Sequence, residues 1–236
     1  MSEIVVFVGL ATALSYVKVF SLPQGGSVTA GSMVPLIWLS LRRGPKIGLF
    51  ACAVYGLVQL ALEPFIFSPA QVLIDYPIAF GALGLAGFFS RWPATRLRVP
   101  ASVDKSIAIA FSVLFFAISC YELTQFAVME TLFFLWLFAL TFLLLLWLYT
   151  PKPWKKPEEY RSNLIPALLG AAVGISGRFL AHFASGVWFF GPYAPPGMSP
   201  IVYSAIYNGS YIVPELIVTM YFMYLIAKSN VLRAYR

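Results

Sequence analysis

The chain has 236 residues, of which 60% are hydrophobic and 11% are charged, and its mean hydropathy is +0.83. These values exclude a water-soluble globular domain and make the lipid bilayer the expected solvent. A net charge of +7 and a pI near 9.5 would fit nucleic-acid binding, but membrane topology explains where the basic residues lie, so we expect no nucleic-acid partner.

Apolar runs follow one another along the chain, each near the roughly 20 residues that cross about 30 Å of hydrocarbon as a helix. They predict an all-α polytopic membrane protein with eight transmembrane helices. The first run follows Met1-Ser2-Glu3, which lacks the basic start of a signal peptide, so we expect a retained helix. The second run is short and is expected to be tilted or broken near its outer end. The expected spans are 3–22, 29–41, 45–63, 69–90, 106–128, 131–149, 163–190 and 201–228.

The basic residues predict the orientation of these spans. All but two of the 16 Lys and Arg residues, Lys18 and Arg178, lie in or at the edge of every second segment between the spans, or at the C-terminal end. The alternate segments, which contain no basic residue, are those around 23–28, 64–68, 129–130 and 191–200. By the positive-inside rule, both termini are predicted to be cytoplasmic and these segments to face outside.

Ionisable residues inside the expected spans are the first candidates for function, because a charge in the membrane is costly and usually lines a cavity or pairs with another charge. Apart from charges at the very ends of the spans, these residues are Lys18, Asp75, Glu122, Arg178, His182 and Glu215. We interpret Lys18 and Glu215 as structural residues or as residues that pair within the bundle. Cys52 and Cys120 also lie in spans and are interpreted as packing residues, so no disulfide, metal site or cofactor is expected.

Several polar side chains are expected at one depth, in the outer third of the membrane. A helix rises about 1.5 Å per residue, which puts Asp75 and Tyr76 two turns below the outer end of the fourth span. His182 lies at a similar depth in the seventh span, with Arg178 one turn deeper on the same face. The polar side chains on the outer turns of the eighth span are Tyr203, Tyr207 and Asn208.

A carboxylate, an imidazole, phenols and an amide beside aromatic rings would suit a flat, nitrogen-rich solute, neutral or cationic. Other interpretations stay open for single residues, since Tyr and Trp near helix ends often form interfacial belts. Asp75 could be solvated or could pair with Arg178, and His182 could be a core histidine. The outer segments add Gln24-Gly25-Gly26 and an aromatic stretch over 188–193.

The expected spans are of two kinds. The fourth and seventh carry several glycines, among them Gly84 and Gly174, and small residues allow helices to approach closely in lipid. By contrast, 131–149 is almost entirely Leu, Phe and Trp without glycine. The glycine-bearing helices are therefore predicted to form the core of the bundle, and the fifth and sixth to be an appended pair that faces lipid.

Several separated motifs occur along the chain in an order that is typical of one known family. They are Pro23–Thr29, Ser40–Gly44, Gln71–Pro77, Phe80–Gly87, His182–Gly186 and Tyr203–Glu215. Together they resemble the thiamine-specific S components of energy-coupling factor (ECF) transporters, over roughly 5–90 and 163–228. The resemblance implies a six-helix S-component-like bundle within a single transmembrane domain, 1–236, to which 104–162 adds an inserted helix pair and a basic cytoplasmic loop, giving eight helices.

The resemblance further implies a substrate-binding subunit of the cell membrane that captures thiamine at its outer face and is not an enzyme. In that family the subunit docks on a shared transmembrane coupling protein with two cytoplasmic ATPases, which drive the uptake. This chain has no nucleotide-binding loop of its own, because Gly44-Pro45-Lys46 lacks the rest of the P-loop pattern.

Individual ligand contacts follow from the same resemblance. Asp75 matches an acidic residue near the thiazolium ring, and Tyr76 the tyrosine that follows it. His182 matches a histidine that contacts the aminopyrimidine, and Phe190 an aromatic that stacks on the ligand. The matching positions of the last helix are Tyr203 and Asn208.

Other implied positions depart from the family pattern or lie elsewhere. Arg178 stands where some relatives have lysine, and Gln71 opens the motif that contains the acidic residue. Tyr55 replaces a tryptophan, and Gly26 aligns with another tryptophan of some relatives. The small residues expected to dock on the coupling protein are Gly9 and Ala13.

Two alternatives stay open at this point, and a third is not expected. The ligand could be a thiamine precursor such as hydroxymethylpyrimidine. The chain could also be a stand-alone secondary transporter that uses Lys18, Arg178 and Glu215 for ion coupling, although we find no internal repeat. A membrane-embedded enzyme using Asp75, Glu215 and His182 is not expected, because the chain has one histidine and no H-E-x-x-H motif.

Overall fold

The computed structural model describes residues 2–92, 95–96, 106–107, 109–110, 161–162 and 164–228. The chain divides into two compact units, one made of Met1–Thr95 with Ser162–Arg236 and the other of Arg96–Arg161. In the second unit, 106–107 and 109–110 are helical. The predicted spans 106–128 and 131–149 otherwise lie outside the described residues, as do Cys120 and Glu122.

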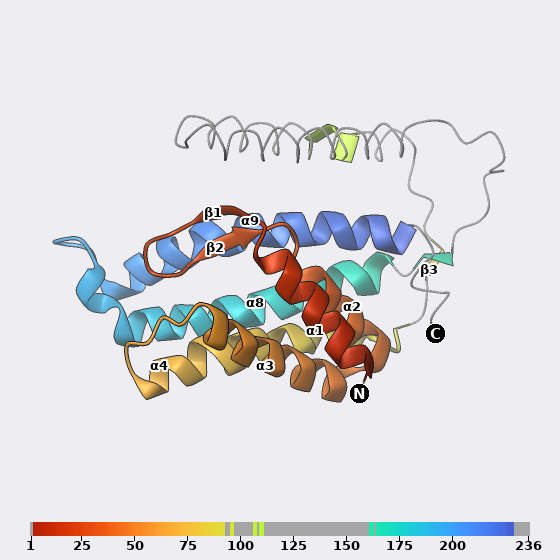
Figure 1. Ribbon diagram of the computed structural model, residues 1–236. Helices are drawn as coiled ribbons and strands as arrows, with labels where there is room; N and C mark the ends of the chain where they lie inside the picture. The colour runs from red at the N-terminus through yellow and green to blue at the C-terminus, as the bar shows by residue number, and fades with distance from the viewer. Residues whose placement is uncertain are drawn as a thin grey trace, which may run out of the picture. The chain divides into compact units, whose positions relative to one another are not determined.

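The first unit is mainly helical (Figure 1). Its helices before the second unit are α1 (Ser2–Ser15), α2 (Met33–Arg43), α3 (Pro45–Leu62), α4 (Pro69–Leu73), η1 (Ile74–Ile78), α5 (Ala79–Gly81) and η2 (Ala82–Phe89). Those after it are α8 (Leu164–Phe189), η3 (Gly191–Tyr193) and α9 (Pro200–Lys228). The strands are β1 (Lys18–Ser21) and β2 (Ser27–Thr29), with β3 (Thr95–Arg96) and β4 (Arg161–Ser162) at the boundaries between the units. Helix α8 packs against both α9 and η2, and α3 packs on the other side of η2.

Four helical stretches of the described residues are long and apolar enough to cross a membrane. They are Pro45–Leu62, Pro69–Phe89, Leu164–Phe189 and Pro200–Ala227. Each agrees within a few residues with a predicted span. The agreement follows because the prediction and this criterion both look for about 20 apolar residues with few charges. The chain is therefore a helical, multi-pass membrane protein, as predicted. Helix Ser2–Ser15 is apolar but shorter.

The prediction that 3–22 is one helix is wrong. Helix α1 ends at Ser15, and the following residues form an antiparallel hairpin in which Phe20 of β1 lies opposite Val28 of β2. The hairpin satisfies its own backbone, since the N–H of Leu22 donates to the carbonyl of Gly26 at 2.6 Å. Gly25 in the turn has a φ of 86°, a conformation that glycine adopts without strain.

The hairpin also changes the position of two predicted features. Lys18 lies on β1 rather than in a helix, and its Nζ is 2.6 Å from Glu63 Oε1, in an ion pair whose side chains are 31% and 49% exposed. The second predicted span, 29–41, begins instead at Met33, because Thr29 is the last residue of β2. Both errors have one cause: apolar composition does not separate a short strand from a helical turn.

The predicted fourth span departs from regular α-helix over much of its length. Ser68 caps its start by accepting a hydrogen bond from the Gln71 backbone N–H at 3.1 Å. The stretch Ile74–Ile78, which contains Pro77, is π-helical, and Ala82–Phe89 is a 3-10 helix. Proline has no N–H to donate, and single π-helical turns occur often at functional sites. Asp75 lies in this irregular turn.

The glycine-bearing helices form the packed centre of the described bundle, as predicted. A Cβ at Gly174 on α8 would lie 2.8 Å from the Leu83 carbonyl oxygen of η2. On the opposite side of η2, a Cβ at Gly84 would collide with the backbone of Leu49 in α3. The helices therefore touch through their backbones, which fixes η2 between α3 and α8.

Candidate functional site

A cavity of about 140 Å³ lies at one end of the bundle, among the hairpin turn, the loop after α3, and helices η1, α8 and α9. All the predicted ligand-contacting residues except Tyr55 line it. These are Gln71, Asp75, Tyr76, Arg178, His182, Phe190, Tyr203 and Asn208. Lining residues to which the sequence analysis gave no role are Gln59, Glu63, Phe65, Phe80, Ser204 and Tyr211.

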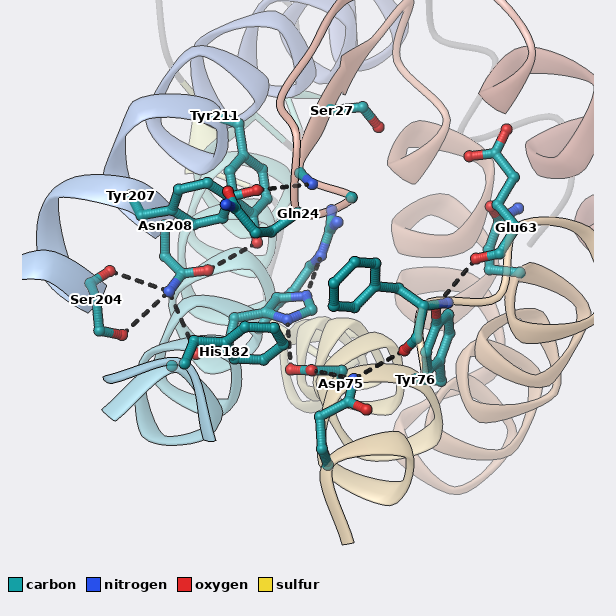
Figure 2. Close-up of a pocket in the computed structure, with 18 of the residues that line it drawn as sticks. Gln24, Ser27, Glu63, Asp75, Tyr76, His182, Ser204, Tyr207, Asn208 and Tyr211 are labelled. Atoms are coloured by element: carbon teal, nitrogen blue, oxygen red, sulfur yellow. Dashed lines mark hydrogen bonds and ion pairs between the residues drawn. The ribbon is translucent and has the colours of Figure 1, made fainter. Parts of the chain in front are cut away.

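The carboxylate of Asp75 is held by donors from two helical segments. His182 Nδ1 on α8 lies 3.1 Å from Asp75 Oδ1 (Figure 2). Gln71 Nε2 donates to Asp75 Oδ2 at 2.6 Å. Gln71 is itself fixed, because its amide oxygen accepts from the Phe67 N–H at 2.9 Å. The side chains of His182 and Asp75 are 12% and 14% exposed, so both remain accessible from the cavity.

The arginine that lines the cavity, Arg178, is neutralised by a buried glutamate on α9. Arg178 Nη1 lies 3.4 Å from Glu215 Oε2, and their side chains are only 8% and 1% exposed. The open alternative that Asp75 pairs with Arg178 is therefore wrong, because Glu215 takes the guanidinium. Glu215 thus pairs α9 with α8, which agrees with the bundle-pairing role considered from the sequence, and its other oxygen accepts from the Thr29 hydroxyl at 2.6 Å. Arg178 also lies over the Phe80 ring, 4.5 Å from its centroid.

The amide of Asn208 joins α9 to α8. Its Nδ2 donates to the Ser204 carbonyl at 3.0 Å and to the His182 carbonyl at 3.3 Å, and its Oδ1 accepts from the Tyr211 hydroxyl at 2.8 Å (Figure 2). The helices meet closely here, since a Cβ at Gly186 would collide with Ser204. Both amide hydrogens of Asn208 have protein acceptors. Its oxygen accepts one hydrogen bond, from Tyr211, and can accept a second one from a ligand.

Aromatic rings from separate elements form another wall. Phe190, which follows α8, lies with its ring centroid 5.7 Å from that of Phe65, in the loop after α3. On α9, the ring centroids of Tyr203 and Tyr207 are 5.9 Å apart, and the two rings lie on one face of the helix, as predicted. The Tyr207 hydroxyl accepts from the N–H of Gly26 at 3.2 Å, which ties the hairpin turn to α9.

Two predicted tyrosines are engaged by the protein itself. The Tyr76 hydroxyl donates to the Glu63 carbonyl at 3.0 Å and accepts from the Phe65 N–H at 2.7 Å, so it holds the loop that carries Phe65. Tyr55 lies outside the cavity because it is 1% exposed behind Phe80, whose ring it meets edge-on at 5.1 Å. It lines a smaller cavity of about 30 Å³, together with Thr29 and Glu215.

The predicted docking residues lie apart from the cavity. Gly9 and Ala13 are exposed on α1, and a Cβ added at Gly9 would meet nothing within 4 Å. Among the described residues, no group of three or more His, Cys, Asp or Glu side chains is placed to hold a metal ion.

Comparison with known protein families identifies the family of this chain. A profile of the family described as thiamine transporter protein (Thia_YuaJ) matches residues 1–233. The chain belongs to this family. The resemblance to thiamine-specific S components is thereby confirmed.

Relatives within the family show the same relationship over most of their length. The chain is 30% identical to the thiamine transporter ThiT of Bacillus subtilis over 220 residues, which cover 92% of this chain and 83% of that protein. It is 25% identical to ThiT of Lacticaseibacillus paracasei over 215 residues, or 88% of this chain and 76% of that protein. The solved structure of ThiT from Listeria monocytogenes has the same fold, with a TM-score of 0.60, 19% identity, and coverage of 97% of this chain and 92% of that one.

Proposed function

We propose that the chain is the membrane-embedded, substrate-binding subunit that captures thiamine from outside for ATP-driven uptake by an ECF-type transporter. Membership of the thiamine transporter family and the names of the relatives support the substrate. The observation that carries the proposal is the charge balance of the cavity. Arg178 is neutralised by Glu215, and Glu63 by Lys18, so that among the described residues of the lining Asp75 is the unpaired formal charge when His182 is neutral.

A singly positive, flat ligand matches this balance. Thiamine carries one positive charge on its thiazolium ring, and the proposed pose puts that ring near Asp75. The ligand would stack on Phe190, with its aminopyrimidine near His182 and Asn208. The free oxygen capacity of Asn208 and the paired Phe190 and Phe65 rings support the pose. The other proposed contacts are Gln71, Tyr76, Arg178 and Tyr203, with Tyr55 behind them.

Calorimetric titration of the purified full chain in detergent tests the substrate. The lining rings are Phe and Tyr and include no tryptophan among the described residues, so heat is a better signal than tryptophan fluorescence. Saturable binding of thiamine at one site is expected. Hydroxymethylpyrimidine should bind more weakly, because it lacks the cation. Thiamine pyrophosphate should also bind more weakly, because the described residues that line the cavity include no unpaired cation to bind its phosphates. A lack of heat with thiamine, in a sample shown to be folded, would refute the proposed substrate.

We further propose an arrangement in the membrane and a set of partners. Gly9 and Ala13 would dock on the coupling protein of an ECF transporter, which works with two cytoplasmic ATPases. The exposed apolar face of α1, with Val5, Val6 and Leu10 beside the two small residues, supports a protein or lipid contact there. Co-purification with a coupling protein, lost when Gly9 and Ala13 are both replaced by Leu, is the test.

The proposed topology has both termini in the cytoplasm and the cavity facing outside. Its support is that the hairpin turn and the loop after α3, which border the cavity, lie in the basic-free segments 23–28 and 64–68. The proposed architecture is a six-helix bundle with an inserted pair over 104–162, within one transmembrane domain. Labelling of single cysteines placed at Gln24 and in the tail after Lys228 by an impermeant reagent would test the sidedness.

A stand-alone secondary transporter is the rival function. The buried Arg178–Glu215 pair favours it, because ion-coupled carriers keep such pairs near the middle of the membrane. Proteoliposomes that contain the chain alone separate the two functions. Thiamine uptake driven by a proton or sodium gradient would support the rival, whereas binding without uptake is expected of a subunit that needs partners.

A further inference from the structure

A continuous chain of hydrogen bonds crosses from the hairpin to the carboxylate of the cavity. It begins at Thr29 on β2, whose hydroxyl donates to Glu215 on α9. Arg178 on α8 donates to the next two members, through Nη1 to Glu215 Oε2 at 3.4 Å and through Nε to His182 Nε2 at 3.3 Å. The other ring nitrogen, His182 Nδ1, lies 3.1 Å from Asp75 Oδ1.

The chemistry of arginine determines which atom donates and which accepts in this row of hydrogen bonds. The Nε–H of a guanidinium is a donor and stays protonated in proteins, so the nitrogen that faces it must accept. His182 Nε2 therefore bears no proton in this arrangement. The proton of the neutral ring is then on Nδ1, where it can be donated to Asp75. A doubly protonated ring would set its Nε2–H against the Nε–H of Arg178.

We propose that Arg178, held by Glu215, is a positioning residue that fixes His182 as its neutral Nδ1–H tautomer. Free histidine side chains favour the opposite tautomer, with the proton on Nε2, so the protein reverses the intrinsic preference. The tautomer is a property of the chain without ligand. Its consequence for recognition rests on the proposed function: a ligand group that replaces Arg178 at Nε2 must itself donate a proton, as the amino group of an aminopyrimidine does.

The packing around the two residues explains why the guanidinium keeps its direction. Phe80 covers the face of Arg178, 4.5 Å from the ring centroid to Cζ, while Glu215 holds its end. Around His182, the ring of Phe80 meets it edge-on at 6.3 Å, and the ring of Tyr211 on α9 at 6.2 Å. The charged partners of the imidazole are Arg178 on its own helix and Asp75 on η1, and each takes one nitrogen.

The test uses the fact that His182 is the one histidine of the whole chain. Growth with 15N-histidine therefore labels a single imidazole, and two-bond correlations to the ring protons identify each nitrogen. In the folded, ligand-free chain at neutral pH, the nitrogen coupled to Hδ2, which is Nε2, should show the unprotonated shift. A protonated Nε2, in either the neutral or the charged ring, would overturn the proposal.

Variants test whether Arg178 causes the tautomer. Arg178→Met combined with Glu215→Gln removes both charges at once and leaves no lone charge buried. His182 should then move toward the Nε2–H form. The matched control is Thr29→Val. It removes the hydrogen bond from Thr29 to Glu215 but keeps the one that Arg178 Nε donates to His182, so the tautomer should not change. If the double variant keeps the Nδ1–H form, Arg178 is not the positioning residue.

Arg178→Lys provides a second variant should the double variant fail to fold. It keeps a positive charge opposite Glu215 but has one nitrogen where the guanidinium has three, so the population of the Nε2–H form should rise. An unchanged tautomer in this variant would also count against the proposal.

Thiamine titration of the same samples links the tautomer to recognition. The Kd of the double variant should rise about tenfold, the scale of one hydrogen bond to a charged or oriented partner, while Thr29→Val should bind like the unmodified chain. The two proposals fail separately. A chain that binds no thiamine but shows the Nδ1–H tautomer refutes the substrate and supports the positioning role, and the reverse result does the opposite.

Discussion

Replacement of Asp75 by asparagine removes the one unpaired charge that the described residues give the cavity, while keeping the size of the side chain. At a separation of about 4 Å and an effective dielectric constant near 20, two opposite unit charges attract by ~4 kcal/mol, before the cost of desolvation. In bulk water the same attraction is ~1 kcal/mol, and the quaternary thiazolium nitrogen has no hydrogen with which to add a hydrogen bond. Because the Asp75 side chain is 14% exposed, the net attraction should lie between these limits, at about 1.5–3 kcal/mol. The Kd for thiamine should therefore rise roughly 10- to 150-fold.

Calorimetry at constant salt measures this change, with Glu63→Gln as the matched control. That substitution removes the same charge from the same cavity, but Glu63 is 49% exposed and already paired with Lys18. An exposed pair contributes about 0–1 kcal/mol, so the control should change the Kd by less than about fivefold. Binding of thiamine to Asp75→Asn within about twofold of the unmodified chain, or equal losses in both variants, would refute the assignment of the cation to Asp75.

Three further changes test the wall, the bundle and the buried pair. Phe190→Ala should raise the Kd for thiamine about tenfold through the loss of a stacking ring, whereas Phe190→Tyr should keep most of the affinity; the same titration measures both. Gly84→Ala should lower the free energy of unfolding by about 1–3 kcal/mol, because its Cβ would meet the backbone of α3; thermal unfolding in detergent reports this, with Gly209→Ala, which has open space around it, as the control. Glu215→Gln alone should lower the melting temperature more than Arg178→Met with Glu215→Gln, because the single change leaves a guanidinium buried without its counter-ion, at a cost of about 3–5 kcal/mol.

Hydropathy was sufficient to locate the long described helices but not the hairpin. Spans such as 163–190 can be predicted because a bilayer demands about 20 apolar residues in a row, a constraint visible in sequence. The stretch around Val19 and Phe20 is just as apolar, yet it pairs with β2. Local composition could not reveal this, because the decisive contact is between strands that are joined by a glycine turn. The turn residues Gln24-Gly25-Gly26 were the available sign, since Asn- or Gly-rich dipeptides between apolar runs favour hairpins.

The depth of the site residues could be predicted, but their pairing could not. Helix rise fixes how far Asp75 and His182 lie below the helix ends, and both line one cavity. The choice of partner for Arg178 depends on how α8 and α9 are rotated and how closely they pack. That choice went to Glu215, which lies 37 residues further along the chain, rather than to Asp75. Sequence spacing within one helix carries no information on contacts between helices, so both pairings were open until the fold was known.

The aromatic wall depends on a glycine that has no contact with the cavity. Gly56 on α3 lies against the carbonyl of Tyr76, where any Cβ would collide, so α3 can pack directly on the π-helical turn. Tyr76 then reaches the loop after α3 and holds it through the Glu63 carbonyl and the Phe65 N–H. That loop places the Phe65 ring beside Phe190. The close approach of two backbones thus determines the position of a stacking ring, and a larger residue at Gly56 should disturb binding by moving Tyr76, and with it both the loop at Phe65 and the neighbouring Asp75.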